Sequence, residues 1–313
     1  MAMTSISAAG TRRAGWLDLS FERRRTLLSL ALLMPAVATV LVLIVYPLYQ
    51  VFEISLREGK VMNFARISAL PLGFGNYSRV LSDPQFWRST STSAIYVAGS
   101  VGAALLIGLA TALLLNRRLP GTRIFRTLIL IPWAVPGVVV SIMFLWIMDG
   151  SFGVFNAMLR DIGLLSGDHA WFADSRTALL AVIVPTIWKT YPLITLTILA
   201  ALQSIPTEIY DAAEVDGAKA VQKFVHVTWP GIQSATALVV MVSCLGVFRD
   251  VDIIFATTGG GPAHATETLA LYVYKEAFQY FRMGAATAVG TMMIAFALLL
   301  SILLGALARR SKY

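Results

Sequence analysis

Charged residues are scarce in this chain. Asp, Glu, Lys and Arg make up 13% of its 313 residues, whereas about 25% is usual in soluble domains. Hydrophobic residues account for 57%, and the mean hydropathy is +0.73. A soluble fold of this length could not bury so much apolar surface, so we expect lipid to surround much of the chain.

The residues that most catalytic and cofactor sites require are also rare. Cys244 is the one cysteine, which excludes a disulfide within the chain. The histidines His169, His226 and His264 lie far apart and show no metal-ligand spacing. No catalytic pair of carboxylates or of Ser and His is evident, and no Gly-x-x-x-x-Gly-Lys-Ser/Thr motif is present to hold ATP phosphates. We therefore predict no catalytic residue, no metal and no cofactor bound by this chain.

Basic residues outnumber acidic ones, which raises the question of a nucleic-acid partner. The formal charge is +8. The Lys and Arg residues are spread between apolar stretches, however, and form no basic face interleaved with aromatic residues. We predict no nucleic-acid partner and attribute the excess to the positive-inside rule of membrane proteins.

Long apolar runs dominate the chain. A helix needs about 20 apolar residues to cross a bilayer. Six runs qualify, so the sequence predicts an all-α, polytopic membrane protein with six transmembrane helices in contact with lipid. Prolines interrupt the third and fourth runs, which indicates kinked helices or a polar path that they line. The six predicted spans are 27–52, 89–116, 127–148, 177–202, 235–256 and 284–308.

The basic residues near the spans predict the orientation. Arg23, Arg24 and Arg25 resemble a twin-arginine export signal, but the apolar run continues far beyond a candidate cleavage site at 36–38, so we predict an uncleaved first span. The connection between the second and third spans carries four arginines and no acid. Because short cytoplasmic loops are enriched in Lys and Arg, we predict that this connection and both termini are cytoplasmic.

The spans also predict the organisation of the chain. Residues 1–26 form a basic cytoplasmic segment, and 27–88 hold the first span and an outer segment. Residues 89–308 form a core of five spans that includes a cytoplasmic loop at 203–234, and 309–313 form a cytoplasmic tail.

The 203–234 loop has the signals of a short helix. Ser204 is the predicted N-cap, Pro206 suits the first turn, and Gly217 suits the left-handed position after the last turn. Two acids lie near the positive end of the helix dipole, Glu208 and Asp211.

A second helical stretch is predicted over 219–229, ending at Pro230. On the first helix, Ala212, Ala213 and Asp216 share a face by their three- and four-residue spacing, together with Ile209. Two interpretations stay open. The pair of helices packs under its own bundle, or the loop receives another protein, since small residues allow a close approach.

This segment resembles the cytoplasmic loop of binding-protein-dependent ABC importer permeases. The family pattern is Glu-Ala-Ala, three residues, Gly and, further on, Ile-x-Leu-Pro. Asp211 replaces the usual Glu and Trp229 the usual Leu, and both departures leave the frame of helix, Gly, helix and Pro intact. The matching residues are Asp211-Ala212-Ala213, Gly217 and Val227-Thr228-Trp229-Pro230.

Further matches along most of the chain are similar to the carbohydrate branch of this family, with its maltose-type and glycerol-phosphate-type permeases. Thr92-Ser93 replaces a frequent Asn-Thr, and Val251 stands where Phe is usual. The matching residues in chain order are Gly75-Asn76-Tyr77, Asp83-Pro84-Gln85-Phe86-Trp87, Gly121, Phe125-Arg126, Pro132, Pro136, Trp146, Gly153, Asn156, Asp252, Thr258-Gly259-Gly260-Gly261-Pro262 and Thr266-Glu267-Thr268.

The resemblance implies a permease with the type I ABC importer fold in a bacterial inner membrane. It implies four partners: an ATPase dimer that binds ATP-Mg, a second and different permease, an extracytoplasmic solute-binding protein, and a sugar or sugar derivative as substrate. In the family, the loop equivalent to 203–234 carries the coupling helix that sits in a cleft of the ATPase. The residues expected to couple are Glu208, Asp211, Ala212, Ala213, Glu214, Asp216, Gly217 and Pro230.

A glycine run follows the fifth predicted span on the expected outer side. Gly259-Gly260-Gly261-Pro262 lacks the lysine of a phosphate loop. The run is either a turn that needs positive φ or an outer loop that meets the solute-binding protein.

Polar and aromatic residues in the fourth and fifth spans are candidates for the substrate path. Charges in membrane spans are costly and face a cavity or pair with one another, and sugar sites use aromatic faces and bidentate polar groups. Pairing of Lys189 with Asp250 or Asp252 is the alternative, whereas an unpaired Lys189 or Arg249 would favour an anionic sugar derivative. The candidates are Trp188, Lys189, Tyr191, Arg249, Asp250 and Asp252.

Two other functions compete with the permease. An ion-coupled secondary transporter would have internal inverted repeats and would work without ATP, and no convincing repeat is found. A polytopic membrane enzyme would need a catalytic cluster at a membrane face. The prediction that best fits all the motifs is a permease that couples ATP hydrolysis by a partner to alternating access.

Overall fold

The computed structural model describes residues 21–58, 70–117 and 120–310. These residues form helices joined by turns and one isolated bridge between Arg57 and Leu72. They fall into two compact units, one up to Glu53 and one from Ile54 onward. The prediction of an all-α fold is confirmed.

The helices are joined by connections of varied length, of which 162–177 and 258–268 are long. In chain order the elements are α1 (Phe21–Val40), η1 (Leu41–Val45), α2 (Tyr46–Ser55), α3 (Gly75–Ser82), α4 (Pro84–Leu115), α5 (Thr122–Leu128), α6 (Ile131–Ala134), α7 (Gly137–Ile147), α8 (Val154–Asp161), α9 (Ala178–Gln203), α10 (Thr207–Val215), α11 (Ala220–Lys223), η3 (Phe224–Thr228), α12 (Trp229–Arg249), α13 (Asp252–Thr257), α14 (Leu269–Tyr274), η4 (Lys275–Gln279) and α15 (Met283–Arg310). The π-helical turns, labelled η, lie between α1 and α2, between α11 and α12, and at the end of α14.

Five helices in the described part are long and apolar enough to cross a membrane, and a bent pair makes a sixth candidate. The bent pair is Thr122–Ala134 with Gly137–Ile147, at an angle of 97°. Its break lies at Val135, which is extended (ψ 132°) because the ring of Pro136 disfavours helical backbone in the preceding residue. The expected six spans agree with this count. The five continuous spans are Arg23–Ser55, Pro84–Leu115, Ala178–Gln203, Ala220–Arg249 and Met283–Ala306.

The spans differ from their predicted bounds by one to several residues, and the fifth ends at Arg249 and not at residue 256. Two of the differences have a local cause. The second span begins at Pro84 and not at residue 89, because Asp83 caps it by accepting a hydrogen bond from the Gln85 amide (2.9 Å). The fifth begins at Ala220 and passes through Pro230, so the prediction that a helix ends at this proline is wrong. The proline is tolerated because it lies in the first turn of α12, after the π turn η3.

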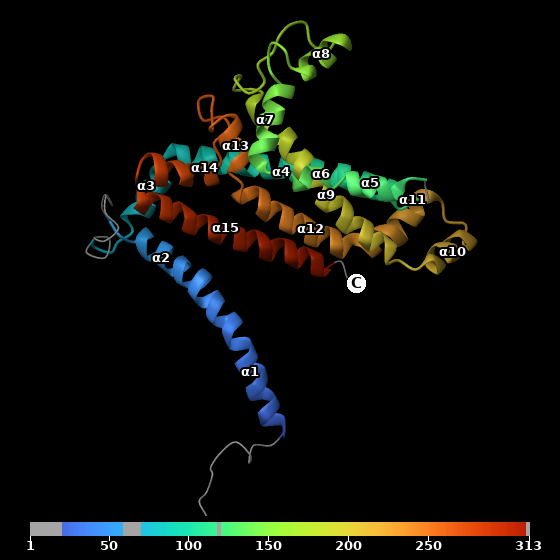
Figure 1. Ribbon diagram of the computed structural model, residues 1–313, viewed down its shortest axis with the longest axis horizontal. Helices are drawn as coiled ribbons and strands as arrows, with labels where there is room; N and C mark the ends of the chain where they lie inside the picture. The colour runs from blue at the N-terminus through green and yellow to red at the C-terminus, as the bar shows by residue number, and fades with distance from the viewer. Residues whose placement is uncertain (1–20, 59–69, 118–119, 311–313) are drawn as a thin grey trace, which may run out of the picture. The chain divides into compact units, whose positions relative to one another are not determined.

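The core of the second unit lies between α4 and α9. Ala104 and Ala112 of α4 and Ile194 and Ile198 of α9 are fully buried. Gly108 marks the closest approach, since a Cβ there would lie 2.8 Å from Cγ2 of Ile194. Small residues bring membrane helices close enough to gain packing energy. Helix α12 packs against α4 and α9, and α15 packs against α12 (Figure 1).

The first unit is a single interrupted helix made of α1, η1 and the start of α2. Every side chain from residue 23 to residue 50 is exposed within this chain. A continuous apolar surface of this kind requires lipid or another protein around it. The unit therefore has the character expected of a membrane span.

Candidate functional site

The helix predicted in the 203–234 loop is α10, and its start differs from the prediction. The N-cap is Pro206, and Ser204 instead ends α9, where its hydroxyl donates to the Ala201 carbonyl (2.8 Å). A proline ring fixes φ near the value that opens a helix, and it has no N–H to leave unpaired. Ser204 was the weaker choice because its hydroxyl is used by the preceding helix.

The end of α10 agrees with the prediction. Gly217 has φ +77°, a conformation that side chains with a Cβ rarely adopt. Its amide donates to Glu214 (3.0 Å), and the Ala218 amide donates to the Ala213 carbonyl (2.9 Å). These bonds satisfy carbonyls that the helix end would otherwise leave open.

Helix α10 has no buried residue within this chain. Two contacts fix it to the following helix: the hydroxyls of Tyr210 and Thr228 lie 3.0 Å apart, and Lys223 pairs with Glu214 at 3.0 Å. Of the eight predicted coupling residues, Ala213 is half-buried and the others are exposed, namely Glu208, Asp211, Ala212, Glu214, Asp216, Gly217 and Pro230. The helix is thus held at a fixed place with its polar and small side chains uncovered.

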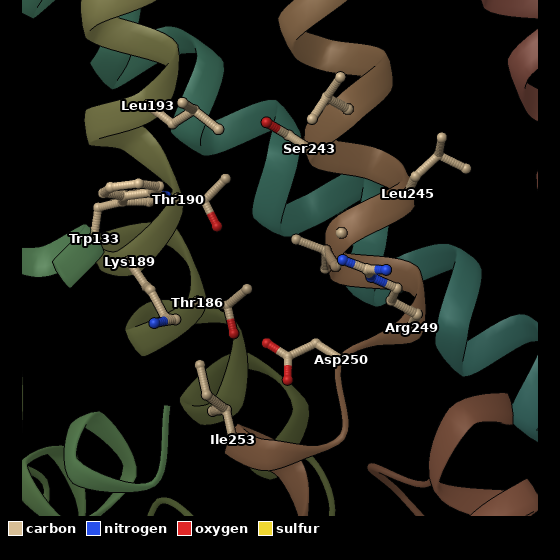
Figure 2. A pocket seen from close by; sticks show the side chains of 13 residues that line it. Trp133, Thr186, Lys189, Thr190, Leu193, Ser243, Leu245, Arg249, Asp250 and Ile253 are labelled. Atoms are coloured by element: carbon tan, nitrogen blue, oxygen red, sulfur yellow. The ribbon is translucent and has the colours of Figure 1, made fainter. Parts of the chain in front are cut away.

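A cavity of 540 Å³ lies between α9 and α12 (Figure 2). It brings together Lys189 of α9 with Arg249 and Asp250 at the end of α12, three of the six residues predicted for the substrate path. Four further polar or aromatic residues that the sequence did not single out also line it, namely Trp133, Thr186, Thr190 and Ser243.

The polar groups of the cavity are unevenly satisfied. The Lys189 ammonium donates to the Val135 carbonyl (2.7 Å), which the break before Pro136 leaves without a helical partner. Asp250 accepts a hydrogen bond from the Asp252 amide (3.0 Å). The Ser243 hydroxyl is buried, at 5% exposure, and has no hydrogen-bond partner among the described residues.

The expected ion pairing in this region is absent from the described structure. Neither Lys189 nor Arg249 has a carboxylate oxygen within 4.0 Å among the described residues. The described structure therefore contradicts the alternative in which Lys189 forms a salt bridge with Asp250 or Asp252. The ammonium is satisfied by the carbonyl that the proline break frees, a partner that no sequence motif indicates.

The other three predicted path residues lie outside the cavity lining. Trp188 packs edge-on against Phe144, with ring centroids 5.8 Å apart. Tyr191 packs against the core between α4 and α9. Asp252 opens α13 and lies against Gly137, where an added Cβ would be 3.0 Å from the Asp252 Cβ.

The loop at residues 258–268 contains the predicted glycine run. Gly259 and Gly260 have positive φ (+58° and +90°), as the turn interpretation requires. Ala263 and His264 also have positive φ (+47° and +65°), so the tip is strained backbone that its surroundings must hold. The hydroxyls of Thr258 and Thr266 close the loop at 2.6 Å.

Glu267 ties this loop to the neighbouring helices. Its carboxylate is 2% exposed and accepts hydrogen bonds from Lys275 (2.5 Å), Gln85 (3.0 Å) and His264 (3.0 Å). Burial alone would raise its pKa, but the bonds from Lys275 and His264 outweigh burial, so the pKa of Glu267 lies below its ordinary value. The sequence marked Glu267 only as part of a resemblance, without this role.

The chain is similar to a known protein family and to several named relatives. Residues 104–313 match the family of binding-protein-dependent transport system inner membrane components. The chain is 34% identical over 262 residues to the trehalose/maltose transport system permease protein MalF of Thermococcus litoralis, covering 83% of this chain and 85% of that protein. It is 32% identical over 288 residues to the sulfoquinovosyl glycerol transport system permease protein SmoG of Agrobacterium fabrum, covering 90% and 89%.

A solved structure shares the fold. It is a bacterial alginate ABC transporter in complex with an alginate pentasaccharide-bound periplasmic protein, with a TM-score of 0.77, 22% identity, and coverage of 93% of this chain and 97% of that one. The predicted permease fold is confirmed by this match together with the spans. The chain is thus a membrane component of a transport system and not an enzyme, and it belongs to the family of binding-protein-dependent transport system inner membrane components.

Proposed function

We propose that this chain is a permease subunit of an ATP-driven importer of a sugar or sugar derivative. In this proposal it lines the translocation path and transmits ATP hydrolysis on a partner ATPase to alternating access. The observation that carries the proposal is α10, a short helix with no buried residue that is tied to the following helix through Tyr210 and Glu214. An exposed, anchored helix is suited to receive a force from another protein.

The connectivity of α10 provides the lever. Its N-terminus follows α9 directly, and its contacts through Tyr210 and Glu214 reach the helix that runs from Ala220 to Arg249. Those two helices form the walls of the 540 Å³ cavity. A displacement of α10 therefore moves both walls, which is the rigid-body rocking expected of alternating access around a central site.

The chain is proposed to act with an ATPase dimer, a second permease and a solute-binding protein, and to have a fixed orientation in the membrane. The chain has no phosphate-binding motif, so ATP-Mg belongs on an ATPase dimer that receives α10 on the cytoplasmic side. A second permease completes the path, because the residues from Ile54 onward leave the cavity open. The 258–268 loop faces outward and meets the solute-binding protein, and both termini are cytoplasmic in the bacterial inner membrane.

A sugar as substrate is supported by the cavity and by the named relatives. Those relatives carry trehalose or maltose, and sulfoquinovosyl glycerol. A cavity of 540 Å³ is in the range of small-molecule sites. Its hydroxyl and charged groups, with Trp133 beside them, match the hydrogen bonds and aromatic contacts that sugars make.

The direct test is purification of the tagged chain from its native membrane, followed by an ATPase assay of the complex. We expect an ATPase and a second permease to co-purify. Gly217→Asp should abolish association or sugar-stimulated hydrolysis, because it forces a side chain into φ +77° and adds charge beside α10. Gly167→Asp is the matched control, since Gly167 is exposed, has open space around it and lacks a positive φ. A chain that purifies alone and transports without ATP would instead be an ion-coupled secondary transporter.

A further inference from the structure

The cavity between α9 and α12 contains more positive than negative charge. Its charged lining residues are Lys189, Arg249 and Asp250, and two positive charges against one negative charge leave a net +1. Figure 2 shows Lys189 on α9 and Arg249 on α12 at opposite sides, with Asp250 between them in this view. Asp252 lies outside the lining, with its amide on the Asp250 carboxylate. Charged groups at membrane depth are costly unless a neighbouring group, water or a ligand offsets them.

Two of the three charges already have polar partners. The Lys189 ammonium donates to the Val135 carbonyl at 2.7 Å, and Asp250 accepts from the Asp252 amide at 3.0 Å. The Arg249 side chain is exposed and makes no hydrogen bond or ion pair among the described residues. Arg249 is therefore the charged group in the lining whose donors are all available.

The chemistry of Arg249 selects the kind of ligand. A guanidinium presents a planar fork of N–H donors that matches a carboxylate, sulfonate or phosphate in two parallel hydrogen bonds. The buried Ser243 hydroxyl has no partner either, and it lines the same cavity as Thr190. The site thus combines a free anion-binding fork with hydroxyls suited to a polyol.

We propose that the cavity binds a sugar with an acidic substituent and that Arg249 recognises this substituent. This inference rests on the proposed function, because it assigns a substrate class to the same site. The acidic group pairs with the Arg249 guanidinium, Asp250 accepts from sugar hydroxyls, and Lys189 stays on the Val135 carbonyl.

The test is ATP-driven uptake into proteoliposomes that contain the complete importer, with its solute-binding protein outside. The probes are pairs of disaccharides that differ in one group, such as cellobiose and cellobiouronic acid, where a carboxylate replaces a hydroxymethyl. We expect the acidic member to enter at least ~10-fold faster. Arg249→Gln should raise the KM for the acidic sugar by at least ~10-fold, since a hydrogen-bonded charge is lost, and Arg249→Lys should restore part of this.

Matched variants separate recognition from general damage. Asp250→Asn keeps an oxygen for the Asp252 amide but weakens an acceptor for sugar hydroxyls, so it should lower uptake of the neutral and acidic members alike, while the preference for the acidic member should persist. Arg176→Gln removes an exposed arginine outside the cavity and should leave uptake unchanged.

The uptake results distinguish failure of the acidic-sugar proposal from failure of the importer proposal. Equal uptake of neutral and acidic members, no uptake of any acidic probe by an ATP-active importer, or an Arg249→Gln variant with unchanged KM would overturn it and leave the importer proposal intact. The last result would indicate that Arg249 pairs with the second permease. Uptake that needs no ATP would instead contradict the proposed function itself.

Discussion

Gly108 and Gly102, both on α4, have different surroundings, and substituting each by alanine tests the packing of α4 against α9. A Cβ at Gly108 would lie 2.8 Å from Ile194 Cγ2 and 3.3 Å from the Thr195 backbone nitrogen, whereas Gly102 has nothing within 4 Å. Gly108→Ala should destabilise the fold by about 1–3 kcal/mol through overpacking. Gly102→Ala should stabilise it by up to about 1 kcal/mol, because alanine favours the helix.

The measurement for this pair is the midpoint of thermal unfolding in detergent, with circular dichroism as the readout. A lower midpoint for Gly108→Ala and an equal or higher one for Gly102→Ala would support the packing. Equal midpoints for the two variants would mean that α4 and α9 do not approach at Gly108.

The buried carboxylate of Glu267 should make the stability of the fold depend on pH. Its pKa lies below the ordinary value near 4.5, so its bonds to Lys275, His264 and Gln85 contribute stability above that value. This stability is lost as the pH falls through the lowered pKa, because the folded state then binds the proton that the unfolded state has already taken up. Glu267→Gln should therefore unfold at a lower temperature than the unmodified chain at pH 7, and the difference should shrink below pH ~4.

Thermal unfolding of both proteins between pH 3 and pH 7 checks this prediction. A gap that stays constant over the whole range would show that the carboxylate charge contributes nothing. A difference in unfolding temperature that grows on acidification would mean that the pKa of Glu267 is raised in the folded state and not lowered.

Some site residues carry no signal in the sequence. Trp133 reaches the cavity only because the third span breaks at Pro136, and its type and position resemble those of an ordinary interfacial tryptophan. Ser243 is one hydroxyl among many in apolar spans, and only its burial without a partner distinguishes it. By contrast, a charge inside a span is unusual, and for that reason Lys189, Arg249 and Asp250 could be predicted.

At the scale of elements, the hydroxyl contact between Tyr210 and Thr228 (3.0 Å) joins α10 to the helix that continues into α12. Tyr210→Phe removes this bond and keeps the ring. A neutral hydrogen bond contributes about 0.5–1.5 kcal/mol, so sugar-stimulated ATPase activity of the complex should fall by about 2- to 10-fold, while binding of the solute-binding protein persists.

Tyr280→Phe is the control for this variant, since Arg282 stacks on the Tyr280 ring and a phenylalanine keeps that contact. Its activity should match the unmodified chain. Full activity of Tyr210→Phe would show that force reaches the cavity through the direct α9–α10 connection alone.

Element ends were predictable where local chemistry decides them. Gly217 ends α10 as expected because the left-handed conformation there strongly favours glycine. The second span starts at the Asp83-Pro84 pair, a cap signal that an apolar-run search misses because residues 88–93 of α4 are polar. The fifth span could not be delimited in this way, because Pro230 is compatible both with a helix end and with the first turn of a new helix.

At the scale of the whole molecule, the orientation in the membrane is testable with single cysteines. Cys244→Ser gives a cysteine-free background. Arg117 and Gly167 are exposed loop residues on opposite predicted sides. A membrane-impermeant maleimide added to spheroplasts should label Gly167→Cys and leave Arg117→Cys unlabelled until the membrane is broken. The reverse pattern would place the 203–234 loop outside and remove α10 from any cytoplasmic ATPase.

Coupling of transport to ATP through α10 is measured as uptake by proteoliposomes with and without ATP at the face that α10 occupies. The preparation contains the co-purified complex and the sugar-loaded binding protein. We expect accumulation only with hydrolysable ATP, and we expect Gly217→Asp to abolish it and Gly167→Asp to leave it unchanged. Accumulation driven by an ion gradient in the absence of ATP, unaffected by either variant, would contradict this coupling.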